Sequence, residues 1–131
     1  MAKLAYDLVS PERKLASGEA DAIQIPGAEG DLTAMPEHAP FLTPLRPGVV
    51  TVRDGGSETA YVVTGGFAEI SPAGAAVLAE EAVKKEEVSA EWFSAKIAEA
   101  EKAHEIASGQ GKTLAALRLN DMKFLASSLG F

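Results

Sequence analysis

The sequence predicts an all-β sandwich as the amino-terminal domain and an antiparallel two-helix hairpin as the carboxy-terminal domain. Up to about residue 82, Gly and Pro turn signals interrupt short β-rich runs roughly every ten residues, which is typical of sandwiches and barrels. After Lys84 these signals stop, Ala, Glu and Lys dominate, and apolar residues recur at helical spacing. We therefore expect two domains, residues 1–85 and residues 86–131.

The predicted strands lie between the turn signals. The clearest β-rich runs cover residues 22–25, 49–52, 59–64, 67–70 and 75–78. The sequences Asp54-Gly55-Gly56 and Gly65-Gly66 are typical of hairpin turns. We therefore interpret residues 49–78 as a continuous antiparallel meander.

Two helices are predicted at about residues 89–108 and 112–128, with Ser89 as the N-cap of the first and Gly109 and Gly111 between them. Each helix carries one apolar stripe, and a short loop joins them, so we expect the stripes to meet. The predicted hairpin seam consists of Phe93, Ile97, Ala100, His104, Leu119 and Met122. The two full stripes also contain Ala107, Ala115 and Ala126. Because so many contact positions are Ala, the seam buries little apolar area and should be weakly held.

Four apolar residues of the second helix fall outside its stripe: Leu114, Leu117, Phe124 and Leu125. We expect them to remain available to the sandwich or to another subunit.

Composition excludes several function classes. The formal charge of -7, from 19 acidic and 12 basic residues, argues against binding to duplex nucleic acid. There are no cysteines, and His38 and His104 have no metal-binding partner at ligand spacing. We expect no metal and no cofactor. No stretch approaches the roughly 20 apolar residues that a membrane-spanning helix needs.

Two catalytic interpretations are weak. The string Gly109-Gln110-Gly111-Lys112-Thr113 ends like a phosphate-binding loop, but Ile106 stands where that motif needs its first Gly, and the string joins two helices. An enzyme using Asp31, Glu37 and His38 as acid and base requires these side chains to converge in a pocket. We expect them on an exposed edge instead, and no catalytic residue is predicted.

The most specific motif runs from Gly27 to Gly48 and reads GAEGDLTAMPEHAPFLTPLRPG. It resembles the Gly-His-Ala-Pro-containing segment of the epsilon subunit of bacterial F-type ATP synthases. The segments VSPER at 9–13 and YVVTGGFAEI at 61–70 resemble two further parts of that family. The mitochondrial delta subunit is similar, but the start of the sequence does not resemble a transit peptide, which favours a bacterial protein.

The resemblance implies a non-catalytic central-stalk subunit of a proton-driven rotary motor. In this family the sandwich joins the gamma subunit to the membrane ring of c subunits, and the terminal helices contact alpha and beta subunits in some members. It implies a peripheral location on the cytoplasmic side of the bacterial inner membrane. The residues expected to face the c-ring are Glu29, Asp31, Glu37 and His38.

Three departures from the family pattern stand out. Glu37 occupies the position where a Gly usually precedes the His. Ser89 and Trp92 replace the Asp and Arg of the ATP-binding pattern, so we expect no nucleotide site; the alternative is an ATP-sensing module with a mobile hairpin. The last helix carries Lys112, Arg118 and Lys123 as its only bases, so we expect weak inhibition of ATP hydrolysis.

Overall fold

The computed structural model describes residues 3–28, 30–35 and 40–131. The chain divides into two compact units, Met1–Lys85 and Glu86–Phe131. The first unit is β-structured and the second is helical, as the predicted fold class requires.

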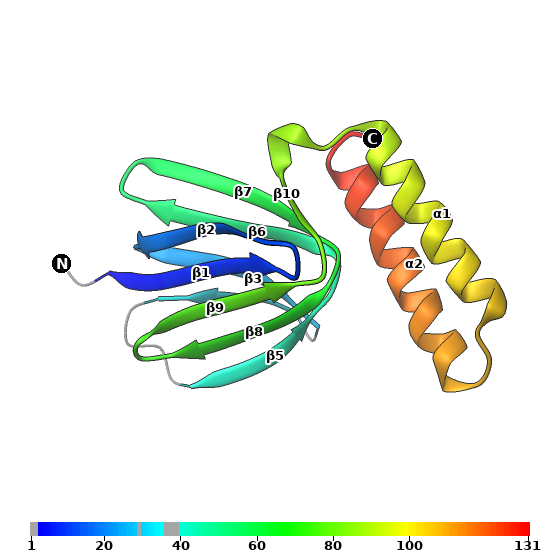
Figure 1. Ribbon diagram of the computed structural model, residues 1–131, viewed down its shortest axis with the longest axis horizontal. Coiled ribbons are helices and arrows are strands. Elements are labelled where there is room, and N and C mark those ends of the chain that lie inside the picture. The colour runs from blue at the N-terminus through cyan, green and yellow to red at the C-terminus, as the bar shows by residue number, and fades with distance from the viewer. Residues whose placement is uncertain (1–2, 29, 36–39) are drawn as a thin grey trace. The chain divides into compact units, whose positions relative to one another are not determined.

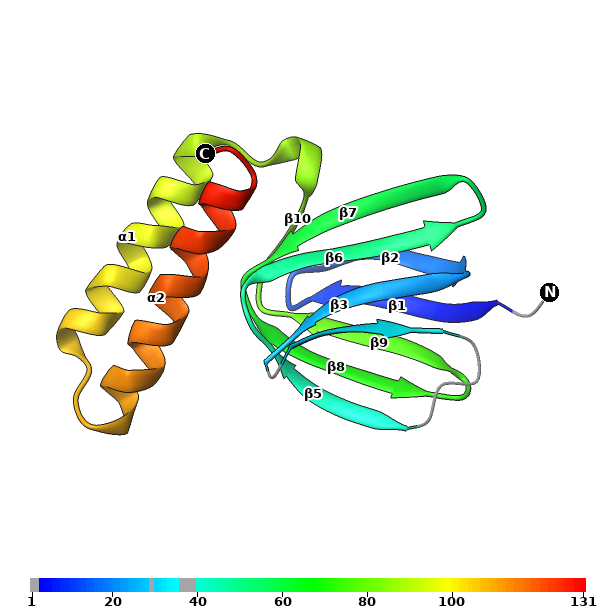
Figure 2. The same cartoon turned by 180° about the vertical axis from the view of Figure 1, so that it is seen from behind.

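Among the described residues the first unit contains ten strands. In chain order they are β1 (Leu4–Ser10), β2 (Arg13–Ala20), β3 (Ala22–Gly27), β4 (Gly30–Ala34), β5 (Phe41–Leu45), β6 (Gly48–Asp54), β7 (Ser57–Val63), β8 (Gly66–Ser71), β9 (Gly74–Ala79) and β10 (Ala82–Lys84). They form two facing layers (Figures 1 and 2). One layer has the order β10-β7-β6-β3, with β4 added to β3, and the other has the order β5-β8-β9-β1-β2.

Neighbouring strands are antiparallel except β1 and β9, which run parallel. This pair joins the start of the chain to the end of the β8–β9 hairpin, so residues far apart in sequence share one layer. The layers meet where Gly27 of β3 pairs with Leu45 of β5.

The core lies between the two layers and follows the alternation of each strand. Leu4 and Leu8 point inward from β1, and Val77 and Ile70 do so from β9 and β8. The facing layer contributes Ile23, Ile25, Val50 and Val63. All eight side chains are at most 2% exposed, so β1, β3, β6, β7, β8 and β9 each contribute fully buried side chains to the core.

The predicted hairpin turn at Gly65-Gly66 is wrong. β7 pairs with β6 and β10, whereas β8 pairs with β5 and β9, so residues 64–66 cross between layers and the expected meander is interrupted. The crossing strand segment is held by Thr64 N donating to Glu81 O (3.2 Å) and by Glu80 N donating to Gly65 O (2.9 Å). By contrast, β6 and β7 do form a hairpin around Gly55, which has φ +61°.

A short 3-10 helix, η1 (Lys85–Glu87), spans the boundary between the units, and the second unit contains the helices α1 (Ala90–Ile106) and α2 (Gln110–Ser128). α1 and α2 lie side by side and antiparallel (Figure 1). Ser89 caps α1 by accepting a hydrogen bond from Trp92 N (3.1 Å). After α2 the chain turns back, so that the Phe131 ring lies 5.3 Å from the Phe93 ring.

Candidate functional site

A row of apolar side chains crosses the outer surface of the layer formed by β5, β8, β9 and β1. Pro44 is paired with Phe67, Phe67 with Leu78, and Leu78 with Val9. Phe67 and Leu78 are 54% and 55% exposed. We call these four residues the apolar row.

The apolar row follows from strand alternation. The core takes Ala68 and Ile70 from β8 and Val77 and Ala79 from β9, so the residues between them must point outward. Phe67 is therefore exposed although its neighbour is completely buried. An exposed stretch of large apolar side chains on neighbouring strands is a feature of protein-binding surfaces.

Val9, Phe67 and Leu78 of the apolar row line a shallow depression. Its lining consists of Val9, Ser10, Pro11, Gly66, Phe67, Leu78, Ala79 and Glu80. Gly66 is required there, because a Cβ at this position would lie 2.0 Å from the carbonyl oxygen of Leu78 and its φ is +132°. The glycine thus lets β8 begin directly against β9 and holds Phe67 beside Leu78.

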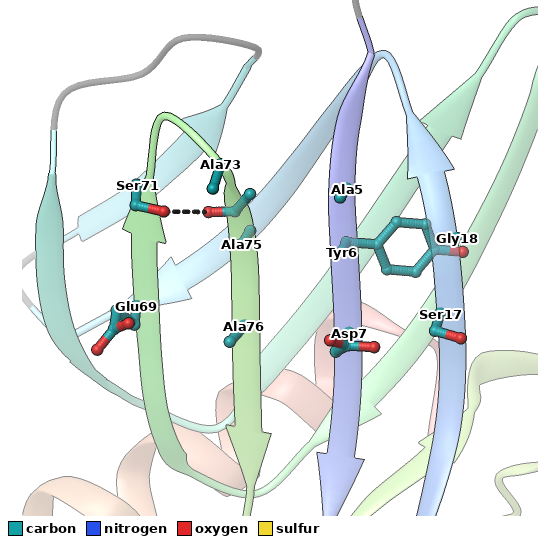
Figure 3. A pocket seen from close by; sticks show the side chains of 11 residues that line it. Ala5, Tyr6, Asp7, Ser17, Gly18, Glu69, Ser71, Ala73, Ala75 and Ala76 are labelled. Carbon is teal, nitrogen blue, oxygen red and sulfur yellow. Dashed lines mark hydrogen bonds between the residues drawn. The ribbon is translucent and has the colours of Figure 1, made fainter.

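A second row lies one pleat further along the same strands and is acidic. Glu69 on β8 is paired with Ala76 on β9, and Ala76 with Asp7 on β1. Figure 3 shows the two carboxylates on either side of a floor of small side chains. We call Glu69, Ala76 and Asp7 the acidic row. The other residues that line the surrounding shallow pocket are Ala5, Tyr6, Ser17, Gly18, Ser71, Ala73, Gly74 and Ala75.

The two carboxylates of the acidic row differ in their partners. Asp7 Oδ1 lies 3.2 Å from Lys14 Nζ on β2, so its charge is offset within the chain. Glu69 is exposed, and among residues 3–28, 30–35 and 40–131 no salt bridge to it is found.

Asp31 is the residue of the expected c-ring interface that the structure describes. It lies on β4 with its side chain 56% exposed, and its Oδ1 is 3.2 Å from Arg46 Nη2. This pair links β4 to the segment between β5 and β6. The other predicted interface residues, Glu29, Glu37 and His38, lie outside the described residues, so their convergence with Asp31 stays a prediction.

In the helical unit Phe93, Ala100 and Met122 are buried, at 1%, 6% and 1% exposure. The other predicted seam residues, Ile97, His104 and Leu119, are half-buried. The placement of Leu125 outside the contact stripe is wrong, because this side chain is 5% exposed. The apolar stripe of α2 is broader than a strict i, i+4, i+7 pattern, and Leu125 lies beside Met122 and Ala126 on the buried face.

The residues at the start of α1 have structural roles. The Ser89 hydroxyl accepts the hydrogen bond that caps the helix, and the Trp92 ring packs edge-on against Phe93 with ring centres 5.0 Å apart. The string Gly109-Gln110-Gly111-Lys112-Thr113 forms the junction of the helices and the first turn of α2.

Within the part of the chain that the structure describes, no three acidic, His or Cys side chains gather as metal ligands. In the same residues neither helix has the length and apolarity needed to cross a bilayer.

Sequence reasoning missed the apolar row and the acidic row. The available signal was the pair of segments Gly66–Ser71 and Gly74–Ala79, in which apolar residues occupy outward as well as inward positions. A half-exposed strand with polar residues on its outer face would not show Phe67 and Leu78 at those positions.

The chain is therefore a β-sandwich with an exposed apolar row on its outer face, followed by a helical hairpin. The model of the ATP synthase delta/epsilon chain β-sandwich domain matches residues 3–85. The ATP synthase epsilon chain of Fuscovulum blasticum is 47% identical over 130 residues, which are 99% of this chain and 98% of that one. The chain therefore belongs to the ATP synthase delta/epsilon family, and the predicted family and fold class are confirmed.

Two further similarities concern domain content and fold. The ATP synthase epsilon chain of Caulobacter vibrioides is 54% identical over 84 residues, which are 64% of this chain but 98% of that one. That relative is thus about as long as the first unit alone. A chain in the central stalk and c-ring of the Tetrahymena thermophila mitochondrial ATP synthase has a TM-score of 0.72 at 19% identity, covering 98% of this chain and 97% of that one. It shares the fold.

Proposed function

We propose that this chain is a non-catalytic central-stalk subunit of a rotary ATP synthase, where it joins the gamma subunit to the c-ring. The observation that carries the proposal is the exposed apolar row on a chain of the delta/epsilon family. The similarity to a chain solved within a central stalk and c-ring supports it. Such a subunit sits at the membrane without entering it, on the cytoplasmic side of a bacterial inner membrane.

The apolar row is the surface that we assign to gamma. Fully burying a side chain of this size stabilises a complex by about 1.5–3 kcal/mol, so covering Phe67 and Leu78 supplies a substantial part of a stable interface. A rotor subunit that transmits torque needs a partner that does not dissociate, and an apolar contact centre suits this requirement.

The polar surface around Asp31 is the part that we assign to the c-ring. Asp31 is accessible, and its pairing with Arg46 fixes the carboxylate in place. Glu29, Glu37 and His38 belong to the same proposed contact. In the helical unit the exposed side chains of Leu114, Leu117 and Phe124 are available to alpha and beta subunits.

The gamma assignment is tested by co-purification from detergent-solubilised membranes. We expect tagged chain carrying Phe67→Asp to lose gamma and the c-ring, because a carboxylate in the apolar row would be desolvated without a partner. Thr59→Asp on the exposed end of β7 is the matched control and should retain both. Retention of gamma by Phe67→Asp would refute the assignment of this face.

The c-ring assignment is tested by cross-linking from a single introduced cysteine, since the chain has none of its own. We expect Asp31→Cys to capture a c subunit and Thr59→Cys to capture none. Loss of the surface ion pair with Arg46 costs at most about 1 kcal/mol, so the variant should fold. Cross-links from Asp31→Cys that never contain a c subunit would contradict this assignment.

A further inference from the structure

The two rows on the outer face of β8, β9 and β1 differ in chemistry but lie next to each other. Successive outward residues on a strand are about 6.8 Å apart, so Glu69 lies about that distance along β8 from Phe67. A partner that covers Phe67 and Leu78 must therefore also approach Glu69. The side chain that the partner places next to Glu69 decides whether the Glu69 carboxylate keeps its water or forms an ion pair.

The surface between the Glu69 and Asp7 carboxylates is formed by residues with small side chains. Ala76 separates Glu69 from Asp7, and Ala5 continues the same surface (Figure 3). Gly74 is the pairing partner of Ala5 and also lines the pocket. Gly74 is tightly constrained, since a Cβ there would lie 2.4 Å from the carbonyl oxygen of Ala5. Small side chains let a partner's backbone come close, which brings its side chains within reach of the Glu69 carboxylate.

Within the described part of the chain Glu69 has no salt-bridge partner, whereas Asp7 has Lys14 at 3.2 Å. A carboxylate that loses water beside an apolar contact is costly unless a cation replaces the water. We propose that this face binds a segment of the gamma subunit in which apolar side chains cover the apolar row and a flanking lysine or arginine pairs with Glu69. This inference rests on the proposed function and specifies the partner's chemistry.

The geometry sets the length of that segment. Neighbouring strands are about 4.8 Å apart, so the apolar row from Pro44 to Val9 spans about 14 Å over three strand intervals. The segment must present two or three apolar side chains over this length. Its lysine or arginine must lie about 7 Å from the apolar row, along β8 in the direction of Glu69.

The test measures the affinity of the full-length chain for a purified alpha–beta–gamma complex lacking it, at low and high salt. We expect Glu69→Lys to weaken binding by about tenfold or more, because it places like charges together in the interface. Glu69→Gln should weaken it less and reduce the salt dependence, since one screened attraction is removed. Glu101→Lys, the same charge change on an exposed residue of α1, should bind like the parent chain.

The outcomes separate this inference from the proposed function. If Phe67→Asp loses binding but both Glu69 variants bind like the parent, the proposed pairing of Glu69 with a lysine or arginine is refuted. The assignment of the apolar row to gamma then stands. If Phe67→Asp and Glu69→Lys both bind normally, both are refuted. Equal weakening by Glu69→Lys and Glu101→Lys would indicate a general charge effect and would also refute the inference. Thermal unfolding of each variant checks that exposed Glu69 tolerates the change.

Discussion

Truncating Phe93 to alanine should unfold the helical unit while leaving the sandwich folded. Phe93 is 1% exposed and contacts both the Trp92 ring at 5.0 Å and the Phe131 ring at 5.3 Å. Removing a buried Phe side chain costs about 3–5 kcal/mol. At about 0.05–0.15 kcal/mol per residue, two helices of this length hold only roughly 2–5 kcal/mol in total. The expected loss is therefore about as large as the whole stability of the unit.

The chain provides a specific probe for this unfolding. Trp92 is the only tryptophan and lies in α1, so its fluorescence reports on the helical unit, while Tyr6 and Tyr61 lie in the sandwich. We expect Phe93→Ala to shift the Trp92 emission to longer wavelength in the absence of denaturant. Amide hydrogen exchange should show lost protection over 90–128 and retained protection in β1, β8 and β9.

Phe124→Ala is the matched control, because it is the same substitution in the same unit at a side chain that is 74% exposed. It should leave both Trp92 emission and amide protection nearly unchanged. Native emission and native protection of the helices in Phe93→Ala would show that the seam does not depend on this ring. Unfolding by Phe124→Ala would show that the exposed face, and not the seam, stabilises the hairpin.

Three further predictions concern the sandwich and the separation of the units. Gly48→Ala should destabilise the sandwich by about 1–3 kcal/mol in urea unfolding, because the new Cβ would lie 2.5 Å from the Cβ of Pro26. Gly56→Ala is the control and should be nearly neutral, because no atom lies within 4 Å of its new Cβ. Burial raises the pKa of Tyr6, so the Tyr6 side chain ionises first in the unfolded chain. The free energy of unfolding should therefore fall as pH rises above about 10, and Tyr6→Phe should reduce this fall. An equal dependence on pH in the parent chain and the variant would contradict this prediction. Deletion of residues 86–131 should leave gamma and the c-ring bound and change ATPase activity little; a large rise in activity would show that the helices inhibit hydrolysis strongly.

Features encoded locally were predictable from the sequence. The start of α1 follows from Ser89, whose hydroxyl caps the helix at the expected position. The β6–β7 hairpin follows from Asp54-Gly55-Gly56, because the turn geometry depends on residues adjacent in sequence. The family was identifiable from the segment between Gly27 and Gly48, whose Pro and Gly positions form a long and specific pattern.

The crossing at Gly65-Gly66 was not predictable from local signals. A glycine permits either a tight turn or the close approach of another strand, and these two causes look identical in sequence. At Gly66 the cause is the Leu78 carbonyl, which belongs to a strand that follows later in the chain. Only the pairing of β8 with β9 distinguishes the two possibilities.

The candidate site was unpredictable for a related reason. The apolar row consists of residues from four strands, and its continuity depends on the parallel pairing of Val9 with Leu78 and the antiparallel pairing of Phe67 with Leu78. Each residue by itself is an ordinary apolar residue in a strand. Likewise, nothing in the sequence indicates that Asp31 pairs with Arg46, since Asp31 lies on β4 whereas Arg46 lies in the connection between β5 and β6, which pair with different strands.

The two units differ in the kind of surface that they can offer to a partner. The sandwich fixes Phe67 and Leu78 on strands whose other faces are fully buried, so these side chains can be covered by a partner with little loss of conformational entropy. The hairpin seam buries Phe93, Met122 and Leu125 together with Ala100 and Ala126, and so has few large contacts to lose. The Caulobacter vibrioides relative is about as long as the sandwich alone. We therefore expect attachment to the rotor to depend on the sandwich more than on the hairpin.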